Sequence, residues 1–181
     1  MGTIARYLVA VDSKLSAAEY ADTAMKVLLQ MEVISESKER DREVFYSGKR
    51  STEPFQMEPG DDEYGFDMGG VYAGGFTLAP EEYVNGVWCP KCNAEMTERW
   101  APQIRDEDGR KEYDSPDVRI SCPKCGAVCR LDEVKSDVLD KLYMTDRFVH
   151  FWDARPFKPE WVAEFDRQMG CHHDVFDYGW T

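Results

Sequence analysis

The chain opens with a mostly apolar segment and continues with apolar residues at helical spacing. Residues 5–11 (Ala-Arg-Tyr-Leu-Val-Ala-Val) predict a buried strand. Residues 16–19 (Ser-Ala-Ala-Glu) have the pattern of a capping box, which predicts that a helix begins there. Its apolar stripe consists of residues spaced by four, Tyr20, Ala24 and Leu28. A second strand is expected near residues 32–35, which would complete a strand–helix–strand unit.

The end of the chain repeats this order of elements. Residues 148–152 are mostly apolar and predict a strand. A helix is predicted to begin at Pro159, because proline is favoured at the first helical position, and to end at Gly170. A final strand is expected over residues 173–178. Two strand–helix–strand halves are the components of a ferredoxin-like two-layer sandwich, so we predict an α+β fold of this kind.

The pattern between these two halves is weaker. Residues 42–47 predict a short strand, residues 50–70 an acidic loop rich in proline and glycine, and residues 70–78 another strand. One helical turn is expected over residues 80–86. The spacing of apolar residues predicts a further helix over about 132–143.

The sequence Cys-Pro-Lys-Cys occurs twice in this middle part of the chain. Proline fixes φ inside each turn, and the residue after each turn, Asn93 or Gly126, readily adopts the left-handed backbone. Such turns direct two sulfurs toward one point, and two of them supply the four thiolates of a tetrahedral zinc site. We therefore expect one Zn²⁺ ion, bound by Cys89, Cys92, Cys122 and Cys125. Four cysteine ligands leave no position for water, which indicates a structural ion.

Both turns resemble the knuckles of the rubredoxin and zinc-ribbon class of metal-binding modules. The resemblance covers about residues 86–131 and implies a zinc ribbon inserted into an α+β body formed by residues 1–85 and 132–181. The 29 residues between the two turns suit a long β-hairpin. Its acidic, glycine-containing tip is expected at residues 106–109, and its returning strand at residues 117–121.

The remaining reactive side chains have simpler interpretations. Cys129 could replace a cysteine of the second turn as a ligand, but we interpret it as a buried thiol that packs as a small apolar residue. Cys171, His172 and His173 are adjacent, and His150 lies on a neighbouring predicted strand. They could form a second metal site or a catalytic cysteine–histidine pair. Because no orienting partner can be assigned from the sequence, we interpret them as a polar helix-to-strand turn.

The charge of the chain is strongly acidic and unevenly distributed. Its 22 basic and 35 acidic residues give a net charge of −13. Residues 1–85 carry 8 basic and 16 acidic residues, whereas residues 86–135 carry 9 and 10. A nearly neutral ribbon disfavours binding to nucleic acid, which needs a basic surface. The acidic remainder suits a basic protein partner, or simply solubility.

Targeting signals are not visible in the sequence. The N-terminus lacks a basic segment followed by a long apolar one, and no apolar run has transmembrane length. Paired cysteines without an export signal indicate a reducing compartment, in which metal binding rather than disulfide formation is expected. The sequence therefore predicts a cytoplasmic protein that is not bound to a membrane.

Three functions agree with these features. We favour a non-enzymatic zinc-binding protein that acts through protein–protein interaction, as an adaptor or toxin-neutralising protein with an acidic surface facing a basic partner. A zinc-ribbon protein associated with nucleic acid is the first alternative. It would need basic residues gathered on one face of the hairpin, namely Lys91, Arg99, Arg105, Arg110, Lys111, Arg119 and Lys124. An enzyme that uses the Cys171/His172/His173 region is the second alternative.

Overall fold

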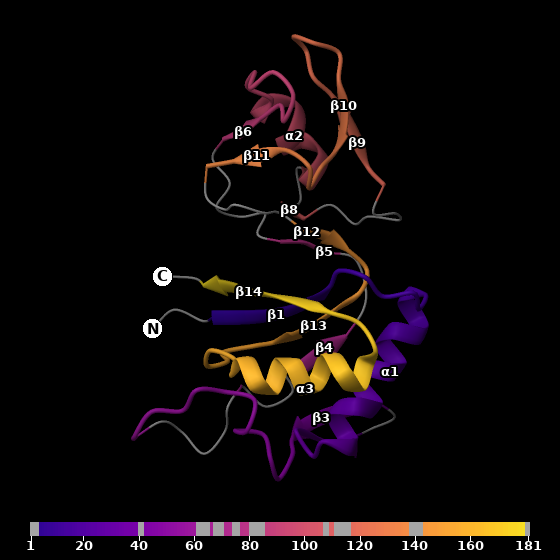
Figure 1. Ribbon diagram of the computed structural model, residues 1–181, viewed down its shortest axis with the longest axis vertical. Helices are drawn as coiled ribbons and strands as arrows, with labels where there is room; N and C mark the ends of the chain where they lie inside the picture. Colours follow the sequence, from indigo (N-terminus) through magenta and orange to yellow (C-terminus); the bar gives the residue numbers. More distant parts are fainter. Residues whose placement is uncertain are drawn as a thin grey trace. The chain divides into compact units, whose positions relative to one another are not determined.

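The computed structural model describes residues 4–39, 42–60, 66, 71–73, 77–79, 86–106, 109–110, 117–137 and 143–179. The chain divides into two compact units, one formed by Met1–Gly75 with Arg147–Thr181 and the other by Phe76–Asp146. Within the described ranges, three helices and several small antiparallel sheets give a mixed α+β fold, as predicted (Figure 1). None of the helices in these ranges is both long and apolar enough to cross a membrane.

The first unit is built on a four-stranded sheet with the order β14-β1-β13-β4, in which every neighbouring pair is antiparallel. Its strands are β1 (Ile4–Ala10), β4 (Val71–Ala73), β13 (Phe148–Phe151) and β14 (His173–Gly179). The central strands come from the two ends of the chain, with Leu8 of β1 opposite Val149 of β13. The sheet therefore joins the N-terminal and C-terminal parts of the chain into one unit.

Both helices of this unit lie on one face of the sheet (Figure 1). Helix α1 (Ala17–Gln30) begins at the predicted capping box, in which the Ser16 amide donates to the Glu19 carboxylate at 2.9 Å. Helix α3 (Pro159–Met169) starts at the predicted proline and ends at Gly170, whose φ is 67°. The core residues with no exposed surface include Leu8, Tyr20, Leu28, Phe55, Val149, Phe151 and Phe165.

The strand expected near residues 32–35 does not return to this sheet. Instead β2 (Ile34–Glu39) pairs with β3 (Arg42–Ser47) in a separate antiparallel hairpin, and β4 occupies the position beside β13. Gly48 fixes the end of the hairpin, because a Cβ atom there would lie 2.1 Å from the Glu32 carbonyl oxygen. Only glycine permits this close approach of two backbones.

In its described residues, the second unit has one helix and small two-stranded antiparallel sheets. The helix is α2 (Thr97–Ile104). Two strand pairs join distant segments, namely β5 (Thr77–Ala79) with β12 (Tyr143–Thr145) and β6 (Val87–Trp88) with β11 (Lys135–Ser136). Two pairs are local, namely β7 (Arg105–Asp106) with β8 (Gly109–Arg110) and β9 (Arg119–Ser121) with β10 (Val128–Arg130). Because β5, β11 and β12 find their partners here, this unit includes residues on both sides of the segment 86–131.

Two local predictions for this unit are wrong. The chain between the cysteine turns is not one long hairpin, because its first part forms α2. Near the expected tip, the described residues form only the short pair of β7 and β8. The helix predicted over 132–143 is not formed in its described part, because Lys135 and Ser136 pair with β6. The helical turn expected at residues 80–86 lies, apart from Gly86, outside the described residues.

Candidate metal centre

The first Cys-Pro-Lys-Cys turn is closed by two backbone hydrogen bonds. The Cys89 amide donates to the Ala94 carbonyl (2.8 Å), and the Asn93 amide donates back to the Cys89 carbonyl (2.9 Å). Asn93 has a φ of 58°, the left-handed conformation that the sequence predicts. The backbone amides of Cys92 and Lys91 are directed at the Cys89 sulfur and hold the pKa of this thiol below its usual value.

The second turn repeats this arrangement. The Cys122 amide donates to the Ala127 carbonyl (2.8 Å), and the Gly126 amide donates to the Cys122 carbonyl (3.0 Å). Gly126 has a φ of 70°. Backbone amides of Cys125 and Lys124 lower the pKa of the Cys122 thiol to about 6. Each turn therefore favours the thiolate at its first cysteine, which is the form that binds a metal.

Together the two turns bring four sulfurs into one group. The sulfurs belong to Cys89, Cys92, Cys122 and Cys125, and all lie within 4.8 Å of one another. The Cys92 and Cys122 sulfurs are 3.6 Å apart, and those of Cys89 and Cys125 are 3.8 Å apart. In a tetrahedral site with metal–sulfur bonds of about 2.3 Å, neighbouring sulfurs are about 3.8 Å apart. The four free thiols therefore have the spacing of a four-thiolate site and could hold a metal ion.

The charge of the group also suits a cation. The backbone amide of Ala94 favours the Cys92 thiolate, but desolvation and the sulfurs of Cys125, Cys122 and Cys89 together raise the pKa of Cys92 to about 12. Four thiolates so close together repel one another, and a divalent cation at their centre removes this repulsion. The donor set, four soft sulfur atoms, is one that zinc readily accepts.

The centre is built into the hydrophobic core of the second unit. Cys89 is 0% exposed and Cys122 3%, whereas Cys125 is exposed. Trp100 of α2 donates from its indole nitrogen to the Leu131 carbonyl at 2.9 Å. The same core contains Val87, Met96, Trp100, Ile120, Cys129, Leu131, Val134 and Met144. The cysteine turns and this core therefore support each other.

A partly buried ion pair ties β12 to the segment that follows β10. Two guanidinium nitrogens of Arg130 lie 2.9 Å and 2.6 Å from the two carboxylate oxygens of Asp132. Asp132 also accepts a hydrogen bond from the Met144 amide (3.1 Å), and Arg130 donates to the Met144 carbonyl (3.2 Å). Both polar groups of the Met144 backbone are thereby satisfied beside its buried side chain.

Cys129 does not belong to the sulfur group. It lies on β10 opposite Ile120 of β9 and is 4% exposed. Desolvation raises the pKa of its thiol. These properties agree with the interpretation of Cys129 as a buried thiol in the core.

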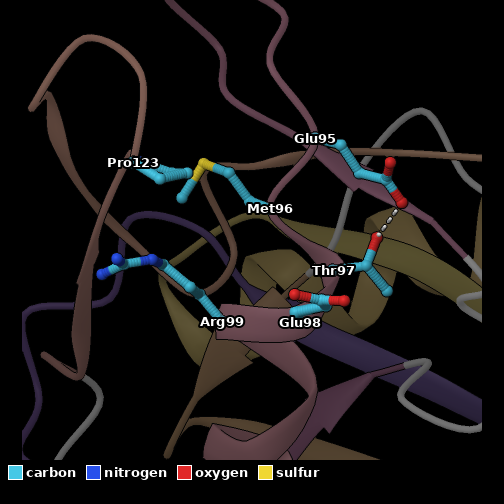
Figure 2. A pocket seen from close by; sticks show the side chains of 6 residues that line it. All are labelled: Glu95, Met96, Thr97, Glu98, Arg99 and Pro123. Atoms are coloured by element: carbon cyan, nitrogen blue, oxygen red, sulfur yellow. Dashed lines mark hydrogen bonds between the residues drawn. The ribbon is translucent and has the colours of Figure 1, made fainter.

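A pocket of about 420 Å³ opens beside the metal centre, between the start of α2 and the second cysteine turn (Figure 2). Its lining residues are Glu95, Met96, Thr97, Glu98, Arg99 and Pro123. Figure 2 shows Met96 directed toward Pro123, while Arg99 and Glu98 leave the helix in different directions. The sequence does not predict this pocket, because its pattern between the two cysteine turns indicates a hairpin rather than helix α2.

The second group of reactive residues is brought together in the first unit. The Cys171 sulfur lies 3.8 Å from Nε2 of His173, and Nδ1 of His173 lies 2.7 Å from a carboxylate oxygen of Asp166. The Tyr20 hydroxyl is 2.9 Å from the same Nε2. The His172 side chain is 77% exposed, and its Nδ1 lies 3.2 Å from the other Asp166 oxygen. The His173 ring is therefore buried and the His172 ring exposed, although both contact the same carboxylate.

His150 takes part in a different set of contacts. Its ring lies on β13 with its centroid 5.1 Å from that of Tyr7 and 5.2 Å from that of Trp152. The sequence points to His150 here but not to Asp166, and it indicates Tyr20 only as a core residue of its helix. Asp166 and Tyr20 reach His173 from separate helices. One signal for Asp166 was present in the sequence. An acidic residue in the last turn of a helix interacts unfavourably with the helix dipole, so its presence there suggests another role, such as contact with a histidine.

Comparisons with known proteins add no family to this description. No protein-family model matches the chain, and searches of curated proteins and of solved structures find no significant match. The geometry of the chain's own residues is therefore the basis for assigning a function.

Proposed function

We propose that this chain is a non-enzymatic zinc-binding protein that acts through protein–protein interaction. One structural Zn²⁺ ion would be held by the four cysteines of the two equivalent turns and, when bound, would cross-link them. The observation that carries the zinc-binding part of this proposal is the pair of sulfur–sulfur distances, 3.6 Å and 3.8 Å. They agree to within about 0.2 Å with the edge of a tetrahedral zinc–thiolate site.

The finer architecture is part of the proposal. The antiparallel order β14-β1-β13-β4, with α1 after β1 and α3 between β13 and β14, supports a ferredoxin-like two-layer sandwich. The matching hydrogen bonds of the two cysteine turns and the β9–β10 pair support a zinc ribbon inserted between its halves. Six free cysteines support a reducing, cytoplasmic environment.

The pocket beside the metal centre supports a basic segment of a partner protein as the binding target. Glu95 and Glu98 are exposed at its wall, and within the described residues Glu98 and Arg99 make no ion pair. A lysine or arginine of the partner could place its aliphatic stem against Met96 and Pro123 and its charge near Glu98. The net charge of −13 would steer such a partner toward the chain.

The metal part of the proposal is tested by native mass spectrometry and elemental analysis of the purified full chain. We expect one zinc ion per chain. Cys122→Ser should lower the zinc content strongly, because a structural site loses a ligand that nothing replaces. Cys129→Ala is the matched control and should keep the ion. Equal loss of zinc in both variants would contradict the four-ligand assignment.

The interaction part is tested by cross-linking and quantitative affinity capture from cells that express the protein. A partner that binds the pocket should be recovered less with Glu98→Gln, whereas Glu160→Gln removes the same charge from an exposed site on α3 and should leave the yield unchanged. Recovery of nucleic acid instead of a protein would favour the alternative. That alternative has less support, because Arg119 is already paired with Asp117 at 2.8 Å.

A further inference from the structure

Three side chains of the first unit have the arrangement of a nucleophile, a base and an orienting acid. The Cys171 sulfur is 3.8 Å from Nε2 of His173, and Nδ1 of that ring is 2.7 Å from Asp166. A carboxylate at Nδ1 keeps the proton there, so that Nε2 presents its lone pair to the thiol. We propose that Cys171, His173 and Asp166 form a thiol relay through which Cys171 reacts with hydrogen peroxide or other small peroxides.

The end of helix α3 builds this arrangement. Asp166 lies in the last turn of the helix, and its carbonyl accepts hydrogen bonds from the Gly170 amide (2.8 Å) and the Cys171 amide (3.3 Å). The left-handed Gly170, with a φ of 67°, then reverses the chain. Cys171, which precedes β14, and His173, the first residue of β14, are consequently both buried close to Asp166.

Burial sets the resting protonation of the pair. The His173 side chain is 0% exposed, and desolvation lowers its pKa although Asp166 acts in the opposite direction. Desolvation also raises the pKa of the Cys171 thiol. The resting pair is therefore a neutral thiol and a neutral imidazole. A thiolate then forms by proton transfer to Nε2, which is how an adjacent base activates a weak nucleophile.

The surroundings of the sulfur select the class of reagent. Acyl transfer is helped by free hydrogen-bond donors, commonly backbone N–H groups, that stabilise an oxyanion. The backbone amides of Cys171 and His172 are already occupied, since Cys171 donates to the Asp166 carbonyl (3.3 Å) and His172 donates to Asp12 (2.7 Å). Cys171 is also only 8% exposed, which restricts access to small molecules. Hydrogen peroxide is small and needs no oxyanion hole.

The proposed reaction is balanced with peroxide as the only added reagent. The Cys171 thiol gives its proton to Nε2 of His173 while the sulfur attacks one oxygen of hydrogen peroxide. A sulfur–oxygen bond forms and the oxygen–oxygen bond breaks. The departing hydroxide takes the proton from His173 and leaves as water. The sulfur is oxidised to a sulfenic acid, the peroxide is reduced, and the histidine returns to its neutral form.

Tyr20 restrains this relay from helix α1. Its hydroxyl lies 2.9 Å from Nε2 of His173, and that nitrogen has a single lone pair. The tyrosine O–H and the cysteine S–H therefore compete for one acceptor, and the shorter hydrogen bond is that of Tyr20. Removal of the hydroxyl should free Nε2 for the thiol and make Cys171 more reactive.

The test uses the reduced, zinc-loaded full chain, treated with hydrogen peroxide in the presence of dimedone, which traps sulfenic acids. Mass spectrometry of the peptides then gives a labelling rate for each cysteine. Cys129, 4% exposed and outside the sulfur group, is the internal reference. We expect Cys171 to be labelled at least about tenfold faster than Cys129. His173→Gln should slow Cys171 labelling by at least about tenfold, and Tyr20→Phe should accelerate it.

The labelling rate of Cys171 is expected to fall in His173→Gln and to rise in Tyr20→Phe. This difference in direction distinguishes a relay from a purely structural role of the two residues. A loosened fold would expose Cys171 and accelerate labelling in both. Thermal unfolding shows whether each variant is folded, and Asp166→Asn, with the same expected slowing, replaces His173→Gln if the latter does not fold. The relay is overturned if these base and acid variants leave the rate unchanged or raise it, or if Cys171 reacts no faster than Cys129.

Discussion

Trp100 donates a hydrogen bond from its indole nitrogen to the carbonyl of Leu131, and both residues are buried beside the two cysteine turns. This single contact joins helix α2 to the segment that follows β10. It links the only helix described in the second unit to the part of the chain that carries the second pair of sulfurs.

We expect Trp100→Phe to destabilise the second unit. The substitution keeps an aromatic ring but leaves the buried Leu131 carbonyl without its donor, which costs about 1–3 kcal/mol in the free energy of unfolding. Denaturant unfolding of the zinc-loaded protein measures the change. Trp88→Phe is the control, because Trp88 is only partly buried and should be affected less. Equal decreases in the free energy of unfolding in the two variants would show that the hydrogen bond to Leu131 does not contribute to stability beyond the loss of the indole ring.

Removal of the metal should unfold the second unit more than the first. The binding free energy of a structural ion is also folding free energy, and the core around Cys89 and Cys122 is small. The larger core around Leu8 and Phe151 contains no cysteine of the sulfur group. Hydrogen exchange measured by peptide, before and after addition of a chelator, should show loss of protection in α2 and retention in α3. Simultaneous loss in both helices would contradict this expectation.

Oxidation of the metal centre should join the two turns rather than close each turn on itself. The sulfurs in contact are those of Cys92 with Cys122, at 3.6 Å, and Cys89 with Cys125, at 3.8 Å. Small rotations of these side chains would bring each pair to the length of a disulfide bond, about 2.05 Å. Treatment of the zinc-loaded protein with diamide should therefore release zinc and form these two disulfides. Disulfide mapping that finds mainly pairs within a turn would refute the expected pairing.

The first unit should lose stability as the solution becomes acidic. Desolvation by burial lowers the pKa of His173 in the folded protein from its ordinary value of 6.5. Between the two pKa values the unfolded chain binds more protons, so stability is complete above about pH 6.5 and falls as the pH drops below it. Asp166 and Asp12 oppose this lowering, and His172 reinforces it.

Denaturant unfolding followed through α3 at about pH 7.5 and pH 5.5 measures this dependence. His173→Gln should flatten it, because the buried titrating group is then absent. His172→Gln is the matched control, since the His172 side chain is 77% exposed and should leave most of the slope in place. If the free energy of unfolding of His173→Gln still changed with pH as it does in the unmodified protein, the pH dependence would belong to groups other than His173.

Local signals predicted the elements whose ends are determined by neighbouring residues. Ser16 and Glu19 form the predicted capping box of α1, and Pro159 and Gly170 mark the two ends of α3. Strand β3 also has the predicted bounds, 42–47. The grouping of four cysteines could be predicted as well, because the two-residue spacing and the left-handed residue after each turn define the direction of the sulfurs.

Features that depend on distant parts of the chain could not be predicted. Helix α2 contains Pro102, and proline inside a segment normally argues against a helix. The sequence pattern therefore did not indicate α2. The apolar spacing near Val134 suggested a helix, yet that side chain is buried in the core of the second unit and the following residues pair with β6. Asp166 and Tyr20 meet His173 only because α1 and α3 pack on the same sheet.

The position of β1 in the sheet has a consequence for synthesis on the ribosome. This strand is synthesised before residues 76–146, yet both of its neighbours, β13 and β14, are synthesised after them. Strand β1 must therefore wait, with its backbone unpaired on both sides, until β13 and β14 have emerged. Residues 76–146 form a contiguous unit and can fold in the meantime. Nascent chains of this protein should thus acquire the cysteine-bearing unit first, while the apolar segment of β1 stays exposed until its two partner strands are available.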